Sequence, residues 1–240
     1  MEKLKNLLPD LPAPTSTPNP QEQARQWPTD QFSQAGYPNR HRLALQAALD
    51  ARGGADAFAG GEIMPWKGKA LERLRAARKE VLGGDCLLGL IGPRGTGKTQ
   101  MAVELGLTLD RQFVLDNPGH TFSSLSQQAP AQKYYVLGQL LDLQKATFGR
   151  DIRPADTPIG KAEQVDLLVL DEVQEIVQTE WQLTTVTRLI DARYQALKRT
   201  ILIGNLTPSG LSQALGSSIT SRMTETGLLV PCDWPSFRDK

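Results

Sequence analysis

Residues 92–99 read GPRGTGKT and match the pattern G-x-x-x-x-G-K-[ST]. The run follows an apolar stretch and opens a helical pattern, as this motif requires. Glycines let the backbone N–H groups turn inward toward phosphate oxygens, and the start of a helix favours an anion. We predict that Lys98 reaches the β- and γ-phosphates of a nucleotide and that the Thr99 hydroxyl binds Mg²⁺. The predicted nucleotide contacts are Gly92, Pro93, Arg94, Gly95, Thr96, Gly97, Lys98, Thr99 and Gln100.

A pair of acids follows a second apolar run, VDLLVLDE at 165–172. Asp171 is placed to hold Mg²⁺ through water, and Glu172 to orient and polarise the attacking water. An Asp-Glu pair favours ATP hydrolysis over a GTPase switch, and the sequence has no obvious Asn-Lys-x-Asp motif for guanine. The expected ligands are ATP and Mg²⁺.

Two further polar residues could complete this chemistry. Asn205 ends the apolar run TILIGN and could sense the γ-phosphate or hold the water; the alternative is a turn-forming asparagine before Leu-Thr-Pro. Arg222 lies in GSSITSRM, on an expected short helix. It is either a surface charge or a residue that serves the site of another copy. The 18 residues after it are too few for a helical lid, so an arginine from a neighbour could close the site.

The elements that must position these residues alternate along the chain. Apolar strands are expected at 86–91, 133–138, 165–170, 200–205 and 227–232, with helices at 98–109, 139–148, 180–197 and 209–215 between them. Strands that are apolar throughout and separated by helices indicate an α/β fold with a parallel sheet covered on both faces. Ligands then bind at the carboxyl ends of the strands. The stretch 110–132 is interpreted as a long loop or insertion.

The first part of the chain has a different composition. Residues 1–35 carry six prolines and few large apolar groups, which predicts a flexible arm. Leu4, Leu7 and Leu8 fall at helical spacing; they are either chance apolar content or a short helix that binds a partner's groove. Residues 36–66 are expected to be a linker with a possible helix at 41–51. The ATPase domain is expected at 67–240, with a helix from Gly68 to Val81.

Bulk composition narrows the class of protein. The 27 basic and 26 acidic residues give a net charge of +1, which argues neither for nor against nucleic acid. Cys86 and Cys232 lie in apolar stretches and are interpreted as buried thiols of a reducing compartment. No apolar run approaches the roughly 20 residues that span a bilayer, and MEKLKNLLPD lacks the long apolar core and the cleavage site expected of a signal peptide. We expect a cytoplasmic protein without a membrane partner.

Taken together, these motifs resemble the AAA+ ATPases and, within them, the DnaC/IstB group of helicase loaders and transposase partners. The resemblance covers about 86–238 and includes RTILIGNLTP (199–208), ALGSSITSRM (214–223) and VPCDWPSFR (230–238). It implies Walker A roles for Lys98 and Thr99 and Walker B roles for Asp171 and Glu172. It also implies that Asn205 is sensor 1 and that Arg222 is a finger inserted into the neighbouring protomer's ATP. Ser217-Ser218 replaces a Glu-Arg pair common in the group, and Val173-Gln174 replaces Ile-Gly.

The resemblance also implies that the helix after the second strand lines a path for single-stranded DNA. Lys145, Phe148 and Arg150 would supply cations for phosphate and an aromatic ring for a base. Alternatively, Phe148 is core, together with Leu140, Leu141 and Leu143.

The function expected from the resemblance is a DnaC-like helicase loader. Such a protein assembles as a ring, spiral or filament on single-stranded DNA and delivers a hexameric replicative helicase during DNA replication. The alternative is an IstB-like regulator of transposition that binds DNA and recruits a transposase. A third hypothesis, a scaffold that binds nucleotide without turnover, is opposed by the intact Glu172.

Overall fold

A computed structural model describes residues 34–52, 61–117, 129–175 and 179–238 of the chain. Its centre is a five-stranded sheet of order β2-β3-β4-β1-β5, in which every pairing is parallel. The strands are β1 (Leu87–Ile91), β2 (Gln132–Val136), β3 (Leu167–Asp171), β4 (Arg199–Gly204) and β5 (Leu228–Pro231). The predicted α/β fold with a parallel sheet is confirmed.

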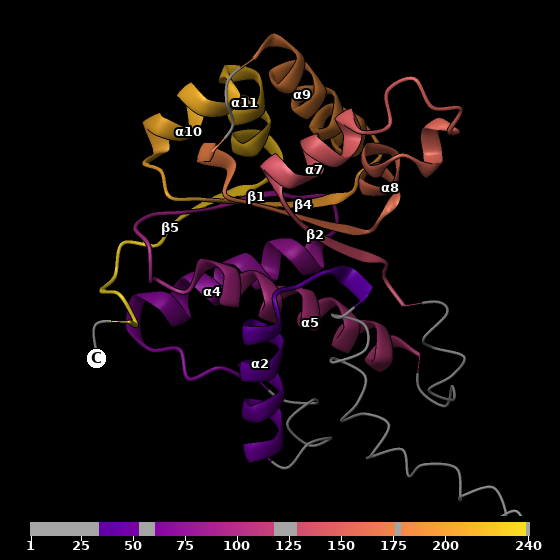
Figure 1. The fold of residues 1–240 in the computed structure, drawn as a ribbon. Helices are drawn as coiled ribbons and strands as arrows, with labels where there is room; N and C mark the ends of the chain where they lie inside the picture. The colour runs from indigo at the N-terminus through magenta and orange to yellow at the C-terminus, as the bar shows by residue number, and fades with distance from the viewer. Residues whose placement is uncertain (1–33, 53–60, 118–128, 176–178, 239–240) are drawn as a thin grey trace, which may run out of the picture.

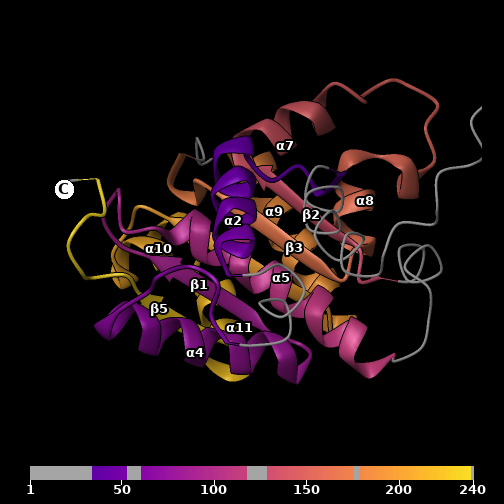
Figure 2. The ribbon, with the colours of Figure 1, turned by 90° about the horizontal axis from the view of Figure 1, so that it is seen from below.

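Helices cover both faces of the sheet, as Figure 1 shows from the side and Figure 2 from below. One face carries α2 (Asn39–Ala51), α4 (Gly68–Gly83) and α5 (Lys98–Asp116). The other carries α7 (Leu137–Lys145), α8 (Pro158–Gln164), α9 (Glu180–Gln195), α10 (Pro208–Leu215) and α11 (Ser217–Thr226). Short 3₁₀ turns, Pro154–Asp156 and Val173–Glu175, complete the described elements.

Each face of the sheet has its own hydrophobic core. Leu88 and Leu90 of β1 point into the core under α4 and α5, whereas Leu87 and Ile91 point into the core under the helices of the other face. Every residue of β1 and β3 is buried. Because both faces are covered, neither strand has solvent-facing positions, which explains the absence of polar alternation in the sequence.

The parallel register brings the candidate residues to one end of the sheet. Ile91 pairs with Gly204, and Leu170 pairs with Leu202. The Gly92 N–H donates to the Gly204 carbonyl at 3.2 Å, so the start of the glycine-rich loop lies beside the end of β4. Since carboxyl ends of parallel strands share an edge, the loop, the acid pair and Asn205 meet there.

The segment before α4 packs into the same core as the sheet. Tyr37, Leu45 and Leu49 are buried, as are Ile63 and Trp66. Glu104 of α5 accepts hydrogen bonds from the Ile63 N–H at 2.7 Å and from Trp66 Nε1 at 2.6 Å. The described part of 36–66 is therefore fixed to α5 by buried apolar contacts and by a buried carboxylate. Residues 1–33, the greater part of the predicted arm, lie outside the described residues.

The interpretation of 110–132 as a loop is wrong at both ends, because α5 continues to Asp116 and β2 starts at Gln132. The continuation of α5 cannot be recognised in the sequence because polar residues of the helix are buried against β2. Gln132 Nε2 donates to Asp110 Oδ1 at 2.8 Å and to the Gly106 carbonyl at 3.0 Å. The next helix, α7, begins and ends earlier than the expected 139–148, and α8 was not predicted.

No helix in the described ranges is long and apolar enough to cross a membrane. Both cysteines are buried, as predicted, and burial raises the pKa of each thiol to about 12.

Candidate nucleotide-binding site

The glycine-rich loop joins β1 to α5, and its lysine is folded onto the loop itself. Lys98 Nζ donates to the carbonyls of Gly92 and Pro93 at 2.7 and 2.6 Å. Burial lowers the pKa of Lys98, and the positive charges of Arg238 and Arg94 lower it further. The ammonium is held at the mouth of the loop by acceptors that a phosphate oxygen could replace.

Asp171 at the tip of β3 is the centre of an oxygen-rich cluster. Its Oδ2 accepts hydrogen bonds from Thr99 Oγ1 at 2.9 Å and from the Tyr134 hydroxyl at 2.7 Å. Its Oδ1 accepts from the Glu172 N–H at 2.7 Å. The adjacent hydroxyl and carboxylate are hard oxygen ligands that suit Mg²⁺, which binds few protein groups and keeps several waters. No group of three or more His, Cys, Asp or Glu side chains in the described ranges could hold a metal.

Glu172 follows directly and has a left-handed backbone, with φ at 57°. Such a conformation is uncommon for a residue with a side chain, and residues of this kind cluster at functional sites. Burial raises the pKa of Glu172, and hydrogen bonding and charge repulsion from Glu175 raise it further. Arg94 of the loop lies 4.0 Å from Glu175 and opposes this effect.

Asn205 follows β4 and stays exposed at the same edge. Its backbone N–H donates to Gln174 Oε1 at 2.9 Å, which ties the end of β4 to the turn after Glu172. Asn205 therefore lies beside the turn that follows Glu172, and within the described ranges its side chain makes no turn-forming hydrogen bond of the kind seen at Thr207.

On the other side of the loop, α2 contacts the first turn of α5. His41 Nδ1 donates to Gln100 Oε1 at 2.9 Å. Burial lowers the pKa of His41, and Arg40 and Arg238 lower it further, while Gln100 and Asp171 oppose the shift. The predicted contact Gln100 thus links the loop to α2, which lies within the segment 36–66 that the sequence predicts to be a linker.

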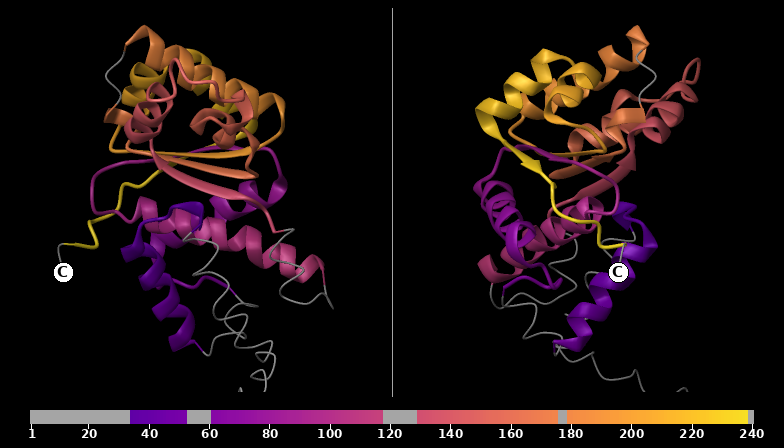
Figure 3. Two further views of the ribbon diagram at one scale, coloured as in Figure 1. Left: turned by 45° about the vertical axis from the view of Figure 1, so that its right-hand side comes forward. Right: turned by 90° about the vertical axis from the view of Figure 1, so that its left-hand side faces the viewer.

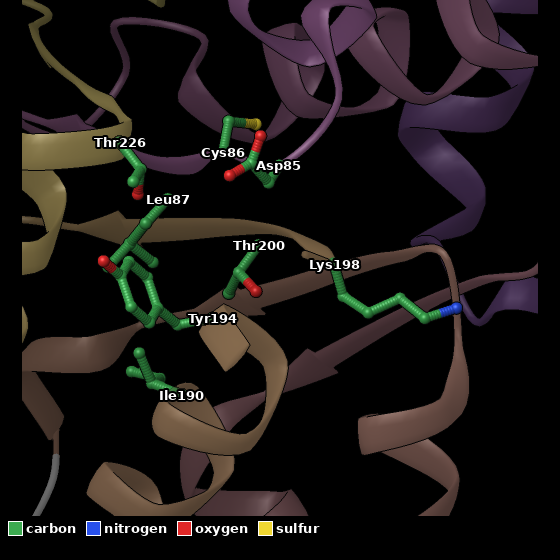
Figure 4. Close-up of a pocket in the computed structure, with 8 residues that line it drawn as sticks. All are labelled: Asp85, Cys86, Leu87, Ile190, Tyr194, Lys198, Thr200 and Thr226. Carbon is green, nitrogen blue, oxygen red and sulfur yellow. The ribbon is translucent and has the colours of Figure 1, made fainter. Parts of the chain in front are cut away.

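Arg222 lies on α11, away from the cluster at Asp171. Its guanidinium forms an ion pair with Asp191 of α9 at 3.1 Å, donates to Ser218, and lies 5.5 Å above the Tyr194 ring. Tyr194 lines a small cavity of about 10 Å³ with Cys86 and Thr200 at the amino ends of the strands (Figure 4). Arg222 is thus directed toward the end of the sheet opposite its own glycine-rich loop.

The residues predicted to contact DNA lie at the end of α7. Phe148 is 56% exposed, and its ring meets the Trp181 ring edge-on with centroids 5.5 Å apart. The two aromatic rings line a groove of about 240 Å³ between α7, α8 and α9, which Arg188 also borders. The core interpretation is wrong for Phe148 and for Leu143, which is 52% exposed, but Leu140 and Leu141 are buried. Lys145 and Arg150 flank Phe148 in sequence but do not line the groove.

Sequence reasoning missed two parts of the site. Tyr134 shares Asp171 with Thr99, yet it stands in the middle of an apolar strand with nothing in its local pattern to mark it. The C-terminal residues after β5 also lie against the glycine-rich loop, where the Phe237 N–H donates to the Gly95 carbonyl at 2.9 Å. The only local signal for this contact was the apolar and aromatic content of VPCDWPSFR.

Comparison with known proteins is consistent with this geometry. No family model matches the chain. The replicative helicase loader DnaC of Buchnera aphidicola subsp. Baizongia pistaciae is 25% identical over 153 residues, which is 62% of this chain and 55% of that protein. The chain therefore spans about half the length of this curated relative.

Among solved structures, a DnaC helicase loader superposes with a TM-score of 0.54 at 21% identity, covering 70% of this chain and 92% of that one. A replication initiator DnaA bound to AMPPCP and single-stranded DNA superposes with a TM-score of 0.53 at 19% identity, covering 75% of this chain and 49% of that one. These likenesses establish the fold. In sequence the chain is similar to DnaC helicase loaders, and in fold it is similar to the P-loop domains of DnaC and DnaA.

Proposed function

We propose that this protein binds and hydrolyses ATP at the carboxyl edge of its sheet. The observation that carries the proposal is the 2.9 Å contact between Thr99 of the loop and Asp171 of β3. It joins a phosphate-binding loop to a carboxylate through two oxygen ligands that suit Mg²⁺. Lys98 directly precedes Thr99, and Glu172 directly follows Asp171. With these two residues the site has the groups that phosphoryl transfer requires.

Each residue of the site has a separate role in binding or hydrolysing ATP. Lys98 exchanges its carbonyl partners for phosphate oxygens, while the loop N–H groups and the start of α5 bind the remaining phosphate charge. Thr99 and Asp171 would hold Mg²⁺, whose chemistry is to neutralise charge on the β- and γ-phosphates. Glu172 orients the attacking water, and its raised pKa makes it a stronger proton acceptor. Asn205 is placed to hold the same water or the γ-phosphate.

Turnover on this proposal is completed by a neighbouring copy. Arg222 faces away from its own loop, so it can stabilise transition-state charge only at another protomer's site. Reaching that site requires the guanidinium to leave Asp191. We therefore propose assembly of the ATP-bound chain into a ring, spiral or filament.

The groove beside Phe148 is proposed to hold a base of single-stranded DNA. The exposed Phe148 ring and the partly buried Trp181 ring meet at right angles and offer a face for stacking. Arg188 supplies a positive charge in the groove, and Lys145 and Arg150 lie within three residues of Phe148 in sequence. With a net charge of only +1, binding depends on this local charge and on several copies acting together.

The biological role proposed is that of a helicase loader acting in DNA replication. The sequence relatives named DnaC support this role over an IstB-like role in transposition. In the proposed role the arm at 1–35 contacts a hexameric replicative helicase, while ATP and DNA control its release.

Substitution of Glu172 by Gln tests the ATPase proposal. ATP binding should persist, and turnover should fall by about 10²–10⁴, because a positioned general base contributes this much. Glu175→Gln is the matched control: it removes a neighbouring carboxylate and should retain turnover within tenfold. Lys98→Ala should abolish nucleotide binding. Equal turnover in Glu172→Gln and wild type would refute the proposed role of Glu172.

Phe148→Ala and Trp181→Ala test the DNA groove by fluorescence anisotropy with labelled oligothymidine and ATP. Each should weaken binding about tenfold or more, since base stacking on an aromatic side chain contributes roughly 1–3 kcal/mol. Leu143→Ala is the control, because Leu143 on α7 is exposed to a similar degree as Phe148 but does not line the groove. An equal effect of all three substitutions would remove the groove from the DNA path.

Capture with the ATP-loaded Glu172→Gln protein separates the two biological roles. Recovery of a hexameric helicase from source-cell lysate, lost on deletion of 1–35, supports the loader. Recovery of a transposase, or of duplex DNA without a helicase, supports the transposition role.

A further inference from the structure

The segment that follows β5 lies along the outside of the glycine-rich loop, and we call residues 232–238 the strap. After β5 the chain leaves the sheet and turns toward the side where α4 and α5 lie, as both views in Figure 3 show. Trp234 Nε1 donates to the Thr96 carbonyl at 2.9 Å, and the Phe237 N–H donates to the Gly95 carbonyl at the same distance. The strap therefore holds two consecutive carbonyls of the loop.

The strap and the loop fit closely, with no room for side chains between them. A Cβ atom on Gly92 would lie 2.5 Å from the Cys232 carbonyl oxygen, and one on Gly95 would lie 2.2 Å from Ser236 Oγ. The Cys232 N–H also donates to the Ile91 carbonyl at 2.6 Å, which fixes the start of the strap to the end of β1. Because the two glycines carry no side chain, the strap packs directly on the backbone of the loop.

The two carbonyl contacts fix the direction of the N–H groups that follow them. Both peptide groups are trans, and in a planar trans peptide group the C=O and the N–H point in opposite directions. The carbonyls of Gly95 and Thr96 point to the strap, so the N–H groups of Thr96 and Gly97 point away from it. Within the described ranges neither of these N–H groups donates to a protein acceptor. Converging N–H groups of this kind are what a glycine-rich loop offers to phosphate oxygens.

We propose that Trp234 is a positioning residue for nucleotide binding, because its indole N–H holds the peptide group between Thr96 and Gly97 in the orientation that presents the Gly97 N–H to phosphate. Gly97 has a positive φ of 83°, and glycine restricts the rotation of its backbone less than any other residue does. The indole hydrogen bond removes that freedom before the nucleotide binds. Pre-organisation of this kind raises affinity, because the cost of ordering the loop is not met at the moment of binding.

This role rests on the ATP site proposed above, and a pair of substitutions separates the hydrogen bond of Trp234 from its packing. The ring is partly buried against the core under α4 and α5. Trp234→Phe keeps an aromatic ring there and removes the N–H donor. Trp234→His loses packing but keeps a donor, since Nε2 of an imidazole has the same place in its ring, relative to Cβ, as Nε1 of an indole. At about pH 8 an imidazole is mostly neutral, so this substitution adds little charge.

Isothermal titration calorimetry on the full-length chain measures the effect with ATP and with ADP, which share the α- and β-phosphates that the loop holds. Trp234→Phe should raise both Kd values about three- to tenfold, as expected for the loss of one neutral hydrogen bond that favours the binding conformation. Trp234→His should return both to within about twofold of wild type, even though its lost packing lowers the urea midpoint.

Lys69→Ala is the matched control. It removes an exposed ion pair with Asp233 of the strap and leaves both carbonyl contacts in place. It should change neither Kd more than about twofold, because exposed ion pairs contribute little.

The outcomes separate this role from the ATP site itself. Unchanged Kd values in Trp234→Phe, with binding abolished in Lys98→Ala, would leave the ATP site standing and overturn the role of Trp234. Equal weakening by Trp234→Phe and Trp234→His would overturn it too, because packing and not the donor would then matter. If Trp234→His does not fold, a raised Kd in Trp234→Phe at an unchanged urea midpoint supports the role, and any other result overturns it. Absence of nucleotide binding by the wild-type chain would refute the proposed ATP site and this role with it.

Discussion

At the residue scale, the candidate site depends on how Asp171 is held. Two hydroxyl groups donate to the same carboxylate oxygen, one from the loop and one from the neighbouring strand. Burial raises the pKa of Tyr134, and the charge of Asp171 raises it further, so the tyrosine remains a donor at any working pH. The pair fixes the carboxylate in the orientation that faces Thr99.

Tyr134→Phe removes one of these donors without changing shape. We expect a loss of about 1.5–3 kcal/mol in the free energy of unfolding, the range for a hydrogen bond to a charged group. Urea denaturation measures it. Tyr135→Phe on the same strand is the control. Burial raises the pKa of Tyr135 without a contribution from a charged or hydrogen-bonded partner, so this substitution should leave the free energy of unfolding nearly unchanged. Equal effects of the two substitutions would contradict a specific role for the Tyr134 hydroxyl.

His41 provides a pH prediction with a definite sign. Its pKa in the folded chain is lowered from 6.5, chiefly by burial, so below that pH the unfolded chain binds more protons than the folded one. Stability should therefore fall as the pH drops below about 6.5, in a window above the range where carboxylates titrate. His41→Asn should flatten this part of the pH profile of the melting temperature.

The other histidine, His120, is the internal control. His120→Asn should leave the slope between about pH 5.5 and 7 unchanged. A slope that disappears in His120→Asn and survives in His41→Asn would refute the assignment.

At the scale of elements, β1, β3 and β4 and their order along the chain could be predicted because nearly all of their residues are apolar and buried. The glycine-rich loop and the acid pair could be placed for the same reason, since each directly follows such a strand. The continuation of α5 could not, because Asp110 and Gln132 are polar and buried against one another. A prediction from periodicity assigns polar residues to the solvent-exposed face. In the folded chain these two residues are instead buried and hydrogen-bonded to each other.

The helix α8 was missed for a different reason. It is only seven residues long, and its apolar content is low. Its start nevertheless has a local signal: Thr157 accepts a hydrogen bond from the Gly160 N–H, and Pro158 occupies the first turn. The same Thr-Pro arrangement precedes α10, where Thr207 accepts from Gly210.

Two glycines test how β5 is attached to the sheet. A Cβ on Gly227 would lie 1.9 Å from the Leu87 carbonyl oxygen, a backbone atom that cannot move without breaking the pairing of β1 with β5. A Cβ on Gly89 would meet Leu229 Cδ1 at 2.8 Å and Met223 Sδ at 2.9 Å, which are ends of flexible side chains.

We therefore expect Gly227→Ala to lower the free energy of unfolding by about 3 kcal/mol and Gly89→Ala by about 1 kcal/mol. Chemical denaturation of both variants measures the difference. A larger loss of unfolding free energy in Gly89→Ala than in Gly227→Ala would show that β5 adjusts to an added methyl group more easily than the core under α11 does.

At the scale of the whole molecule, the position of Arg222 links one protomer to the next. Its pair with Asp191 is partly exposed, and such pairs contribute about 0.5–1 kcal/mol. If assembly requires Arg222 to leave Asp191, that energy opposes assembly.

Asp191→Asn should therefore strengthen ATP-dependent assembly by about two- to fivefold, measured by sedimentation velocity. Arg222→Ala should abolish assembly-stimulated hydrolysis while retaining ATP binding. The double variant should gain nothing from Asp191→Asn, because the arginine that the substitution frees is absent. A gain of equal size in the double variant would mean that Asp191 acts independently of Arg222.

The placement of the tryptophans has an optical consequence. Trp234 donates a hydrogen bond to the glycine-rich loop, and Trp66 lies against Phe237 with ring centroids 5.7 Å apart. Trp181 lies at the groove, where its ring contacts Phe148. Each proposed binding site thus has its own intrinsic fluorophore. With the fourth tryptophan, Trp27, also replaced by phenylalanine, a Trp181→Phe protein would report nucleotide through Trp66 and Trp234. A protein with phenylalanine at 27, 66 and 234 would report DNA through Trp181, so that the order in which the two ligands bind could be timed without a label.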